Sequence, residues 1–391
     1  MSGPLHGVRV LDLTSVVMGP FATQTLGDLG ADVITIESSK GETNRIMGLG
    51  PHPQLSGVAL NLLRNKRNVA LDLKHPDGRA TLLRIASTCE VFVTNLRPGP
   101  LARLGLAYDD VVAVRPDVVF CAAQGYSADS GRADDPAYDD IVQSASGMAD
   151  VMRRATGRPA LVPTIFADKV SGLTMTYAIL AALFERERSG LGQYLELPMV
   201  DAVAAFLLVE HGAGAIGQPP QGGAGYSRVL TEHRRPQQTL DGWITVFPYT
   251  SEHFDDLFDA TGRHDLAGDD RLATTRGRAA NPDLLYATLG ALVATKTTAQ
   301  WLTLCRDRGI PVALMADLDD VVDALPQAEH PVAGTYRQIP PPVRFSRTPA
   351  DVRRHAALVG EHNREVLLEV GLSDAEIDGL ESAGVLRSRP A

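Results

Sequence analysis

A strand, a helix and a second strand follow one another at the start of the chain, and this order limits the folds that it can adopt. The patterns predict a strand at residues 8–13 (VRVLDL), a helix at 20–29 that stops at Gly30, and a strand at 32–37 (DVITIE). Two strands joined through a helix lie parallel, with a right-handed crossover between them. Parallel sheets are covered on both faces. The start of the sequence therefore predicts an open α/β sheet between two layers of helices.

The same alternation of strands and helices continues to about residue 211. Further strands are predicted at 69–73, 91–94, 118–123 and 193–197, of which 91–94 and 118–123 are short runs rich in strand-forming residues. Apolar patterns predict helices at 76–87, 138–152, 168–189 and 199–209. The helix at 168–189 holds the most apolar stretch, which is too short to cross a bilayer and contains Ser171 and Thr174. We therefore expect no membrane association.

A Gly- and Pro-rich stretch at 212–225 (GAGAIGQPPQGGAG) is the best linker in the sequence. Beyond it, Asp241-Gly242 separates two extended runs and predicts a hairpin, and helical patterns follow at 252–260, 282–293 and 297–308. Two short helices end the chain, and the last opens at Ser373 with a capping-box pattern. We predict a large domain at 1–211, a linker at 212–225, a smaller α+β domain at 226–325 and a C-terminal segment at 326–391.

The composition excludes several classes of function. The formal net charge of the 391 residues is −10, which argues against a general nucleic-acid surface. The three cysteines are odd in number and far apart, so they predict neither a disulfide framework nor a zinc site, and they fit a reducing compartment. The first residues lack the basic stretch and apolar run of a secretory signal. We expect a cytoplasmic protein that binds no nucleic acid and no metal.

The turn after the first strand (TSVVMGP, residues 14–20) lacks the glycines of a dinucleotide site. Such a site needs glycines where the backbone approaches a pyrophosphate, and here only Gly19 is present, while Pro20 removes a backbone donor. The sequence also lacks a phosphate-binding P-loop, a paired His spacing for a catalytic metal and a G-x-S-x-G nucleophile turn. A classical NAD or FAD site is therefore not predicted.

Basic residues gather in one region of this acidic sequence. As a group they could bind the phosphates of a nucleotide cofactor. For any single one a solvated surface position is the simpler interpretation, and the sequence alone favours the surface. The residues are Arg64, Lys66, Arg67, Lys74, Arg97 and Arg103.

Asp168 precedes the long apolar helix and has two interpretations. Asp is a preferred helix N-cap, and spacing alone favours that role. A carboxylate near a helix N-terminus is also ionised at pH 7, because the pKa of free Asp is about 3.9. Such a carboxylate can attack a thioester without a general base.

Short motifs along nearly the whole chain resemble those of the class III CoA-transferases, a family that includes formyl-CoA transferase, carnitine CoA-transferase and α-methylacyl-CoA racemase. Each motif is weak alone, but in this order they are highly specific. They are residues 5–14 (LHGVRVLDLT), 19–20 (GP), 29–34 (LGADVI), Glu37, 65–67 (NKR), 71–74 (LDLK), 95–99 (NLRPG), 103–106 (RLGL), 138–139 (YD), Gln143, Gly147, Asp168, 181–183 (AAL), 190–193 (GLGQ), 199–202 (MVDA), 309–311 (GIP) and 360–363 (GEHN).

The resemblance implies a Rossmann-like large domain that the C-terminal segment completes, a smaller α+β domain, and a homodimer whose two chains interlock like rings. It implies an enzyme that moves CoA from an acyl-CoA to a carboxylic acid, with Asp168 as the nucleophile that forms an aspartyl-CoA thioester. Val17 and Ser38 depart from formyl-CoA transferase, which has a polar residue and an Arg there. The implied coenzyme A site consists of Val17, Met18, Leu71, Leu73, Lys74, Asn95, Leu96, Arg97, Arg103, Tyr138 and Asp139.

Three other functions stay open beside the transferase. A racemase of this family would carry a His in a Gly-His-Asp pattern, where this chain has Ala137-Tyr138-Asp139. It would also carry a Glu shortly before the Asp-Gly hairpin, where residues 236–240 contain no acid. Both differences favour the transferase, although Glu232 and His233 lie nearby. Asp168 argues against a non-catalytic CoA-binding dimer, and hydrolysis would result if water outcompeted the acceptor acid.

The acyl groups are less well defined by the sequence. The Gly-rich residues 222–225 form a shorter and differently placed stretch than the glycine loop of formyl-CoA transferase, which argues against formyl and oxalate. Residues 16–18 indicate an acyl pocket less polar than one for oxalate. Backbone N–H groups after Asp168 or at 222–225 are the expected donors to the oxyanion.

Overall fold

The computed structural model describes residues 3–387, and this part of the chain forms two compact units. The first unit consists of the described residues up to Ser146, of Pro163–Phe206, and of the described residues from Leu325 onward. The second consists of Gly147–Val162 and Leu207–Ala324.

This division differs from the predicted domain boundaries mainly in one segment, and by a few residues at 207–211 and at residue 325. Residues 147–162 fall in the predicted large domain 1–211, but in the structure they belong to the second unit. A hydrogen bond of 2.6 Å from Arg154 to the backbone carbonyl of Ala224 joins this segment to the Gly-rich stretch of the same unit. The boundaries of the functional domains stay a prediction.

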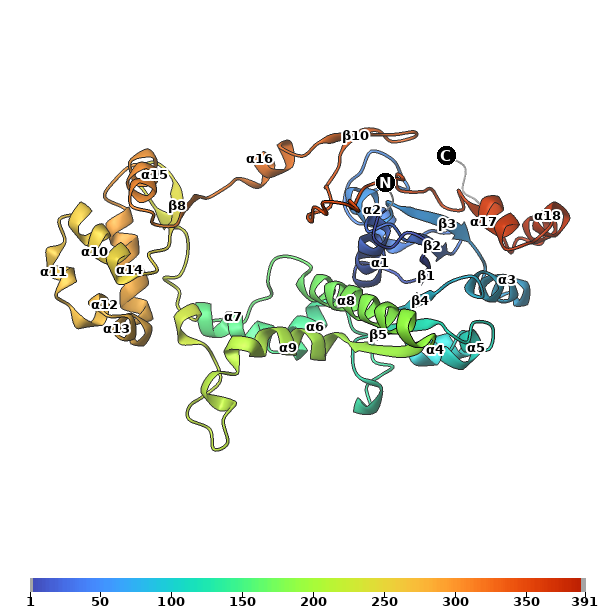
Figure 1. Ribbon diagram of the computed structural model, residues 1–391, viewed down its shortest axis with the longest axis horizontal. Coiled ribbons are helices and arrows are strands. Elements are labelled where there is room, and N and C mark those ends of the chain that lie inside the picture. Colours follow the sequence, from blue (N-terminus) through green and yellow to red (C-terminus); the bar gives the residue numbers. More distant parts are fainter. Residues whose placement is uncertain (1–2, 388–391) are drawn as a thin grey trace. The chain divides into compact units, whose positions relative to one another are not determined.

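A six-stranded parallel sheet forms the centre of the first unit and confirms the predicted α/β class (Figure 1). The strand order is β3-β2-β1-β4-β5-β6, so the order reverses between β1 and β4. The loops after these two strands diverge and leave a crevice at their carboxyl ends, where open α/β sheets bind ligands. The strands are β1 Arg9–Leu13, β2 Asp32–Glu37, β3 Lys66–Ala70, β4 Val91–Thr94, β5 Val119–Gln124 and β6 Gln193–Pro198.

Strand β3 begins and ends three residues before the strand predicted at 69–73. Its first residues are polar, a pattern typical of a loop, but their side chains are buried and bind carboxylates inside the unit. Lys66 donates to Asp12 at 2.9 Å, and Asn68 donates to Glu37 at 2.6 Å. These tertiary partners allow a polar sequence to form an interior strand.

Helices cover both faces of the sheet. Helix α1 (Met18–Asp28) packs along α8 (Phe166–Ser189) on one face. Helix α3 (Pro76–Ala86) shares a core on the other face with α17 (Asn363–Glu369) and α18 (Asp374–Ser382) (Figure 1). The shorter helices of this unit are α2 Gly57–Leu62, α4 Pro98–Arg103, α5 Tyr108–Val112 and α6 Asp139–Ala145, and α9 Met199–His211 begins in it.

The C-terminal segment closes on the open edge of the sheet at β3. Asn363 accepts a hydrogen bond from the backbone N–H of Ala70 at 2.9 Å, and a β-bridge joins Leu71 to Leu386. The predicted capping box at Ser373 is confirmed, because Ser373 and Glu376 bond reciprocally at the start of α18. A small antiparallel pair of β10 Gln327–His330 and β11 Gly334–Arg337 precedes these helices.

The second unit combines a three-stranded antiparallel sheet with helices. The predicted Asp-Gly hairpin is confirmed, because β7 Gln237–Gln238 and β8 Trp243–Val246 pair around it, and β9 Val312–Leu314 pairs with β8. Its helices are α7 Met148–Thr156, α10 Ser251–Ala260, α11 His264–Ala267, α12 Asp270–Ala273, α13 Thr275–Ala280, α14 Pro282–Val293, α15 Thr298–Asp307 and α16 Leu318–Asp323. In neither unit is any described helix both long enough and apolar enough to span a membrane.

Candidate active site

A cleft of about 330 Å³ opens at the carboxyl ends of the central strands, at the point where the strand order reverses. The loops after β1, β4 and β5 form its walls, and the start of α8 contributes Asp168. This is the place where an open α/β sheet is expected to hold a ligand. The lining residues are Ser15, Val16, Met18, Asn95, Leu96, Arg97, Pro100, Ala123, Gln124, Gly125, Asp135, Pro136, Ala137, Tyr138, Asp168 and Met199.

Asp168 lies in the first turn of α8 and is not its N-cap. The helix begins at Phe166 with Ile165 at the N-cap position, so the cap interpretation from spacing is wrong. The Asp168 backbone N–H is bound instead by Oδ1 of Asp139, at 3.1 Å. The Asp168 side chain is 6% exposed and borders the cleft. Another residue thus caps the helix end, and the Asp168 carboxylate stays available for chemistry.

The surroundings of Asp168 raise its pKa from 3.8 to about 6. Burial is the largest cause, because it disfavours the charged form, and the nearby carboxylate of Asp139 acts in the same direction. The backbone N–H of Met18 faces the Asp168 carboxylate and opposes the rise. Asp168 is therefore mostly ionised at pH 7 and more basic than an exposed aspartate. Its shift towards neutral pH is typical of functional carboxylates.

A glycine lets α8 approach the turn that carries Met18. A Cβ atom on Gly172 would lie 2.8 Å from the Met18 carbonyl oxygen and 3.0 Å from the ring of Phe21. A contact of 2.8 Å to backbone is too short for a side-chain carbon to fit without movement. Gly172 follows Asp168 by one helical turn, so this close packing brings the Asp168 carboxylate to the Met18 N–H.

The side chains after β4 hold the cleft from the opposite side. Asn95 binds Ser15 twice, because its Oδ1 accepts from the Ser15 N–H and its Nδ2 donates to the Ser15 carbonyl, both at 2.9 Å. Arg97 donates to the backbone carbonyl of Asp134 at 2.6 Å, which fixes its guanidinium beside the loop before α6. Tyr138 is the exposed residue before that helix. Asn95 therefore shapes the first loop, while Arg97 and Tyr138 border the opening.

A second cleft, of about 570 Å³, adjoins the first and shares Pro100 with it. Lys74, Arg79 and Arg103 are exposed on its walls, and no carboxylate belongs to its lining. Over residues 3–387 these three cations form no ion pair within the chain. The arrangement favours an anion such as a phosphate group.

Three of the six basic residues that cluster in the sequence lie inside the unit. The surface interpretation is therefore wrong for these three. Lys66 is 1% exposed and binds Asp12, Arg64 binds Asp28 at 2.6 Å, and Arg67 binds Asp32. All three are buried in internal ion pairs, so they are neither solvated surface nor a phosphate site. Lys74, Arg97 and Arg103 are the members that border the two clefts.

The predicted CoA-site residues divide into three groups. Met18, Asn95, Leu96, Arg97 and Tyr138 border the first cleft together with Asp168, while Leu73, Lys74 and Arg103 border the second. The remaining three, Val17, Leu71 and Asp139, border neither: Val17 and Leu71 are buried, and Asp139 contacts the Asp168 backbone.

Several cleft residues were not predicted from the sequence. Gln124, Asp135 and Met199 border the first cleft, and Arg79 borders the second. The only signal for Gln124 and Met199 is position, since Gln124 ends β5 and Met199 follows β6. Within the part of the chain that the structure covers, no three His, Cys, Asp or Glu side chains gather in a way that could hold a metal ion.

Comparisons with known proteins agree over nearly the full length. A family model described as CoA-transferase family III matches residues 5–363. The chain is 30% identical to the succinyl-CoA:glutarate CoA-transferase of Mus musculus, over 98% of this chain and 90% of that protein. It is 32% identical to a probable fatty acyl-CoA transferase of Mycobacterium tuberculosis, over 92% of this chain and 96% of that protein.

Solved structures match the fold as well. A crystal structure of the M. tuberculosis protein has a TM-score of 0.78 at 31% identity, covering 93% of this chain and 98% of that chain. A CAIB/BAIF family protein from Brucella suis has a TM-score of 0.79 at 25% identity, covering 95% of this chain and 100% of that chain.

Proposed function

Since the chain belongs to CoA-transferase family III, we propose that it moves CoA from an acyl-CoA donor to a carboxylic acid through a covalent thioester on Asp168. One observation carries the assignment of Asp168: its carboxylate is buried at the carboxyl ends of the sheet, borders the first cleft, and has a pKa raised to about 6. A desolvated but ionised carboxylate is a nucleophile that needs no general base.

The proposed chemistry balances without any proton transfer. The Asp168 carboxylate attacks the thioester carbonyl, the C–S bond breaks, and a mixed anhydride and CoA thiolate result. The thiolate attacks the aspartyl carbonyl, the anhydride C–O bond breaks, and the donor acid leaves as a carboxylate. An acceptor carboxylate then reverses both steps. Each step exchanges one anionic nucleophile for one anionic leaving group, so the enzyme mainly has to position the groups and stabilise the oxyanions.

The backbone N–H of Met18 supports this chemistry as an oxyanion donor. It faces the Asp168 carboxylate, at which negative charge develops when the thiolate attacks. A single donor of this kind contributes about 2.7–4 kcal/mol to the stabilisation of the transition state. We assign this role to Met18 in place of the donors that were expected after Asp168 or at residues 222–225.

The substrate acids differ among the relatives, whose names include glutarate, malate, oxalate and fatty acyl groups. In this chain, Val16, Met18 and Met199 give the first cleft an apolar wall near Asp168. We propose a donor or acceptor acid less polar than oxalate. The test of function below therefore uses both small diacyl and longer acyl donors.

The test of this function is the mass of the intact protein after incubation with a panel of acyl-CoAs. A CoA-sized adduct is expected with the true donor, and hydroxylamine should convert it to a hydroxamate that peptide mapping places at Asp168. A clear preference for succinyl-CoA over longer donors would reject the less polar acyl pocket alone. If no donor gives an adduct and solvent deuterium enters the α-carbon of a 2-methylacyl-CoA, the transferase proposal is rejected in favour of a racemase.

We propose that the second cleft binds the phosphates of CoA, because Lys74, Arg79 and Arg103 meet there without carboxylate partners. Arg103→Ala is expected to weaken CoA binding about tenfold, the effect of losing one charge-assisted contact, and to leave the melting temperature unchanged because the side chain is exposed. Calorimetric titration with CoA measures this change, and Arg158→Ala, an exposed arginine of the second unit, is the control. An unchanged dissociation constant would remove Arg103 from the site.

We further propose an interlocked homodimer with Rossmann-like domains. The support is a set of large apolar side chains that α8 and α9 expose in this single chain: Leu173, Tyr177, Phe184, Phe206, Leu208 and Val209. Patches of this kind mark interaction surfaces. A stable monomer in light scattering at low concentration would contradict the dimer.

The three cysteines are free and buried, and we propose a reducing compartment such as the cytoplasm. Cell fractionation tests this location.

A further inference from the structure

The turn between β1 and α1 holds one residue in a strained conformation. Val16 has a φ angle of 67°, in the left-handed region that a β-branched residue rarely adopts. Strain of this kind costs about 1–3 kcal/mol and persists where neighbouring groups fix it. Two residues later, the Met18 N–H reaches the Asp168 carboxylate. The conformation of Val16 therefore determines where that N–H points.

Both backbone polar groups of Val16 face side chains from the segment after β2. The carboxylate of Glu42 interacts with the Val16 N–H, which lowers the Glu42 pKa. Nδ2 of Asn44 donates to the Val16 carbonyl at 3.3 Å. Asn95 holds the preceding residue from the opposite side of the turn. The strained residue is thus clamped at its N–H and at its carbonyl by two residues that do not border the cleft.

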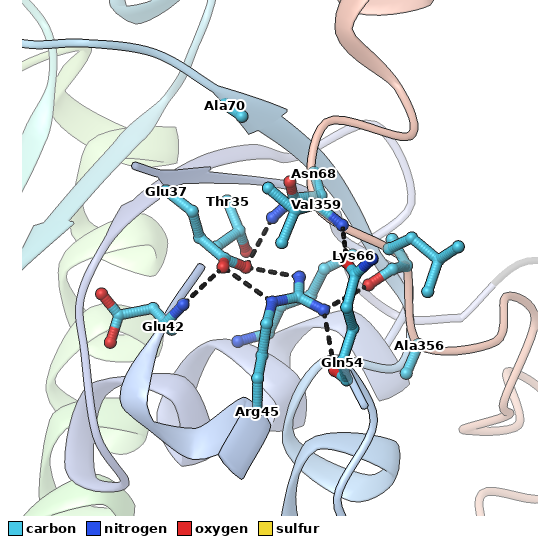
Figure 2. Close-up of polar contacts among 12 residues, drawn as sticks. Thr35, Glu37, Glu42, Arg45, Gln54, Lys66, Asn68, Ala70, Ala356 and Val359 are labelled. Carbon is cyan, nitrogen blue, oxygen red and sulfur yellow. Dashed lines mark hydrogen bonds and ion pairs between the residues drawn. The ribbon is translucent and has the colours of Figure 1, made fainter. Parts of the chain in front are cut away.

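The clamp itself is anchored to the interior of the unit. Figure 2 shows the backbone N–H of Glu42 bound to the buried carboxylate of Glu37, at 2.8 Å, while the Glu42 carboxylate points away from that pair. Arg45 binds the same Glu37 through two nitrogens, and Ser56 donates to the Asn44 carbonyl at 2.6 Å. Because the backbone of this segment is fixed in this way, its side chains can hold the Val16 turn in one position.

The Asn44 side chain is only partly satisfied by hydrogen bonds, and its contact with Val16 explains why it lies in this position. Its Oδ1 is buried and finds no hydrogen-bond partner among the described residues. Leaving such a group unsatisfied costs about 1–3 kcal/mol. The buried Asn44 thus leaves its Oδ1 unsatisfied while its Nδ2 binds the Val16 carbonyl.

We propose that Glu42 and Asn44 are positioning residues for CoA transfer, which hold the Val16 turn so that the Met18 N–H points at Asp168. This inference rests on the proposed function, because it assigns the two residues a role through the Asp168 nucleophile. Neither residue contacts the substrate cleft directly, so both act through the backbone of residues 16–18.

The charge of Glu42 gives the clamp a pH dependence. Burial raises the Glu42 pKa to about 7, and the carboxylates of Glu37 and Asp12 add to the rise. The cations on the same side, Arg45 and Lys66, are bound to Glu37 and Asp12 respectively. As pH falls through 7, Glu42 takes up a proton and its interaction with the Val16 N–H loses the negative charge. The rate of transfer should therefore begin to fall near pH 7, before Asp168 is protonated near pH 6.

The experiment measures the single-turnover rate of the Asp168 adduct and the dissociation constant of CoA. Glu42→Ala is expected to slow adduct formation about 10- to 100-fold, the effect of misplacing a catalytic group. Asn44→Ala should give a smaller loss in the same direction. CoA affinity should change less than twofold, because neither side chain borders the clefts. Thr43→Ala is the matched control, since it removes an exposed side chain between the two residues.

The conservative variant Glu42→Gln separates positioning from folding. It keeps an acceptor oxygen, so at pH 8 the loss should be no more than about fivefold, because a charge-assisted hydrogen bond is roughly twice as strong as a neutral one. Its rate should start to fall near pH 6 instead of pH 7. If Glu42 had a purely structural role, the replacement would not change the pH at which the rate begins to fall.

The possible results distinguish the two proposals. If the wild type forms the adduct and Glu42→Ala forms it at the same rate, the positioning role is rejected and the nucleophile stands. If Glu42→Ala does not fold, an unchanged pH profile in Glu42→Gln rejects the role. If the wild type forms no adduct with any donor, the proposed function and this inference fall together.

Discussion

Replacing Asp168 with alanine is expected to abolish CoA transfer while CoA still binds. The variant lacks the atom that forms the covalent bond, and the residues of the second cleft remain in place. Loss of a covalent nucleophile typically lowers kcat by about 10⁴-fold or more. The CoA-sized adduct should disappear from the intact mass, and the dissociation constant of CoA should stay within about twofold of the wild type.

A second variant, Asp168→Asn, should be more stable than the wild type at neutral pH. The pKa of Asp168 rises from 3.8 to about 6 in the folded protein, so the native state binds this proton more tightly than the unfolded chain does. Ionisation of Asp168 therefore costs stability, and the cost is absent below about pH 4, grows between 4 and 6, and is complete above 6. It amounts to about 3 kcal/mol at most. Asp168→Asn removes this cost, so urea unfolding should show a gain at pH 7.5 that vanishes near pH 4.

Asp140→Asn provides the matched control for both measurements. Asp140 is an exposed carboxylate in the first turn of α6, next to Asp139, and it does not border the clefts. Its replacement should change neither turnover nor stability by more than a small amount, as is usual for surface positions. Retained turnover in Asp168→Ala would reject the nucleophile assignment. Equal stability of Asp168→Asn and the wild type at pH 7.5 would show that the carboxylate is better solvated than its burial indicates.

The sheet could be predicted from the sequence because its central strands are buried on both faces. Residues 33–36 and 91–94 are rich in β-branched and aromatic residues, and the bounds predicted for these strands, 32–37 and 91–94, agree with β2 and β4. Strand β3 could not be placed in this way. Its Lys66 is stabilised by Asp12, a residue 54 positions away, and no local sequence pattern predicts such a partner. Arg64 and Arg67 also form internal ion pairs, with Asp28 and Asp32, and these three pairs explain why the basic residues do not form one cluster in the structure.

The site could be predicted in part, for a related reason. Asn95 and Arg97 follow a strand that ends at the crevice, so their position is implied once the sheet is known. The environment of Asp168 was not predictable, because Asp139 and the Met18 N–H approach it from two other segments. The position of the Val16 turn depends on a valine in the left-handed region, a conformation that sequence patterns would predict only for glycine or asparagine.

The buried ion pair of Arg45 and Glu37 should be among the most costly interactions to break in this chain. Arg45 is 3% exposed, and it binds both carboxylate oxygens of Glu37 at 2.8 and 2.6 Å (Figure 2). Its remaining nitrogen donates to the carbonyls of Gln54 and Ala357, at 3.3 and 2.9 Å. Arg45→Met is therefore expected to lower the free energy of unfolding by about 3–5 kcal/mol, because Glu37 stays buried without its counter-charge. Urea unfolding at pH 7.5 measures the loss.

Arg364→Met is the control that makes this prediction specific to burial. Arg364 also binds carboxylates, those of Asp374 and Asp378, but its side chain is 42% exposed. Exposed pairs of this kind contribute about 0–1 kcal/mol, since water screens the charges and the side chains lose freedom when they pair. Two arginines with similar partners should thus differ severalfold in their effect. If Arg45→Met cost no more than Arg364→Met, water would have to reach Glu37, and the segment that clamps Val16 would lack the rigid anchor that we assign to it.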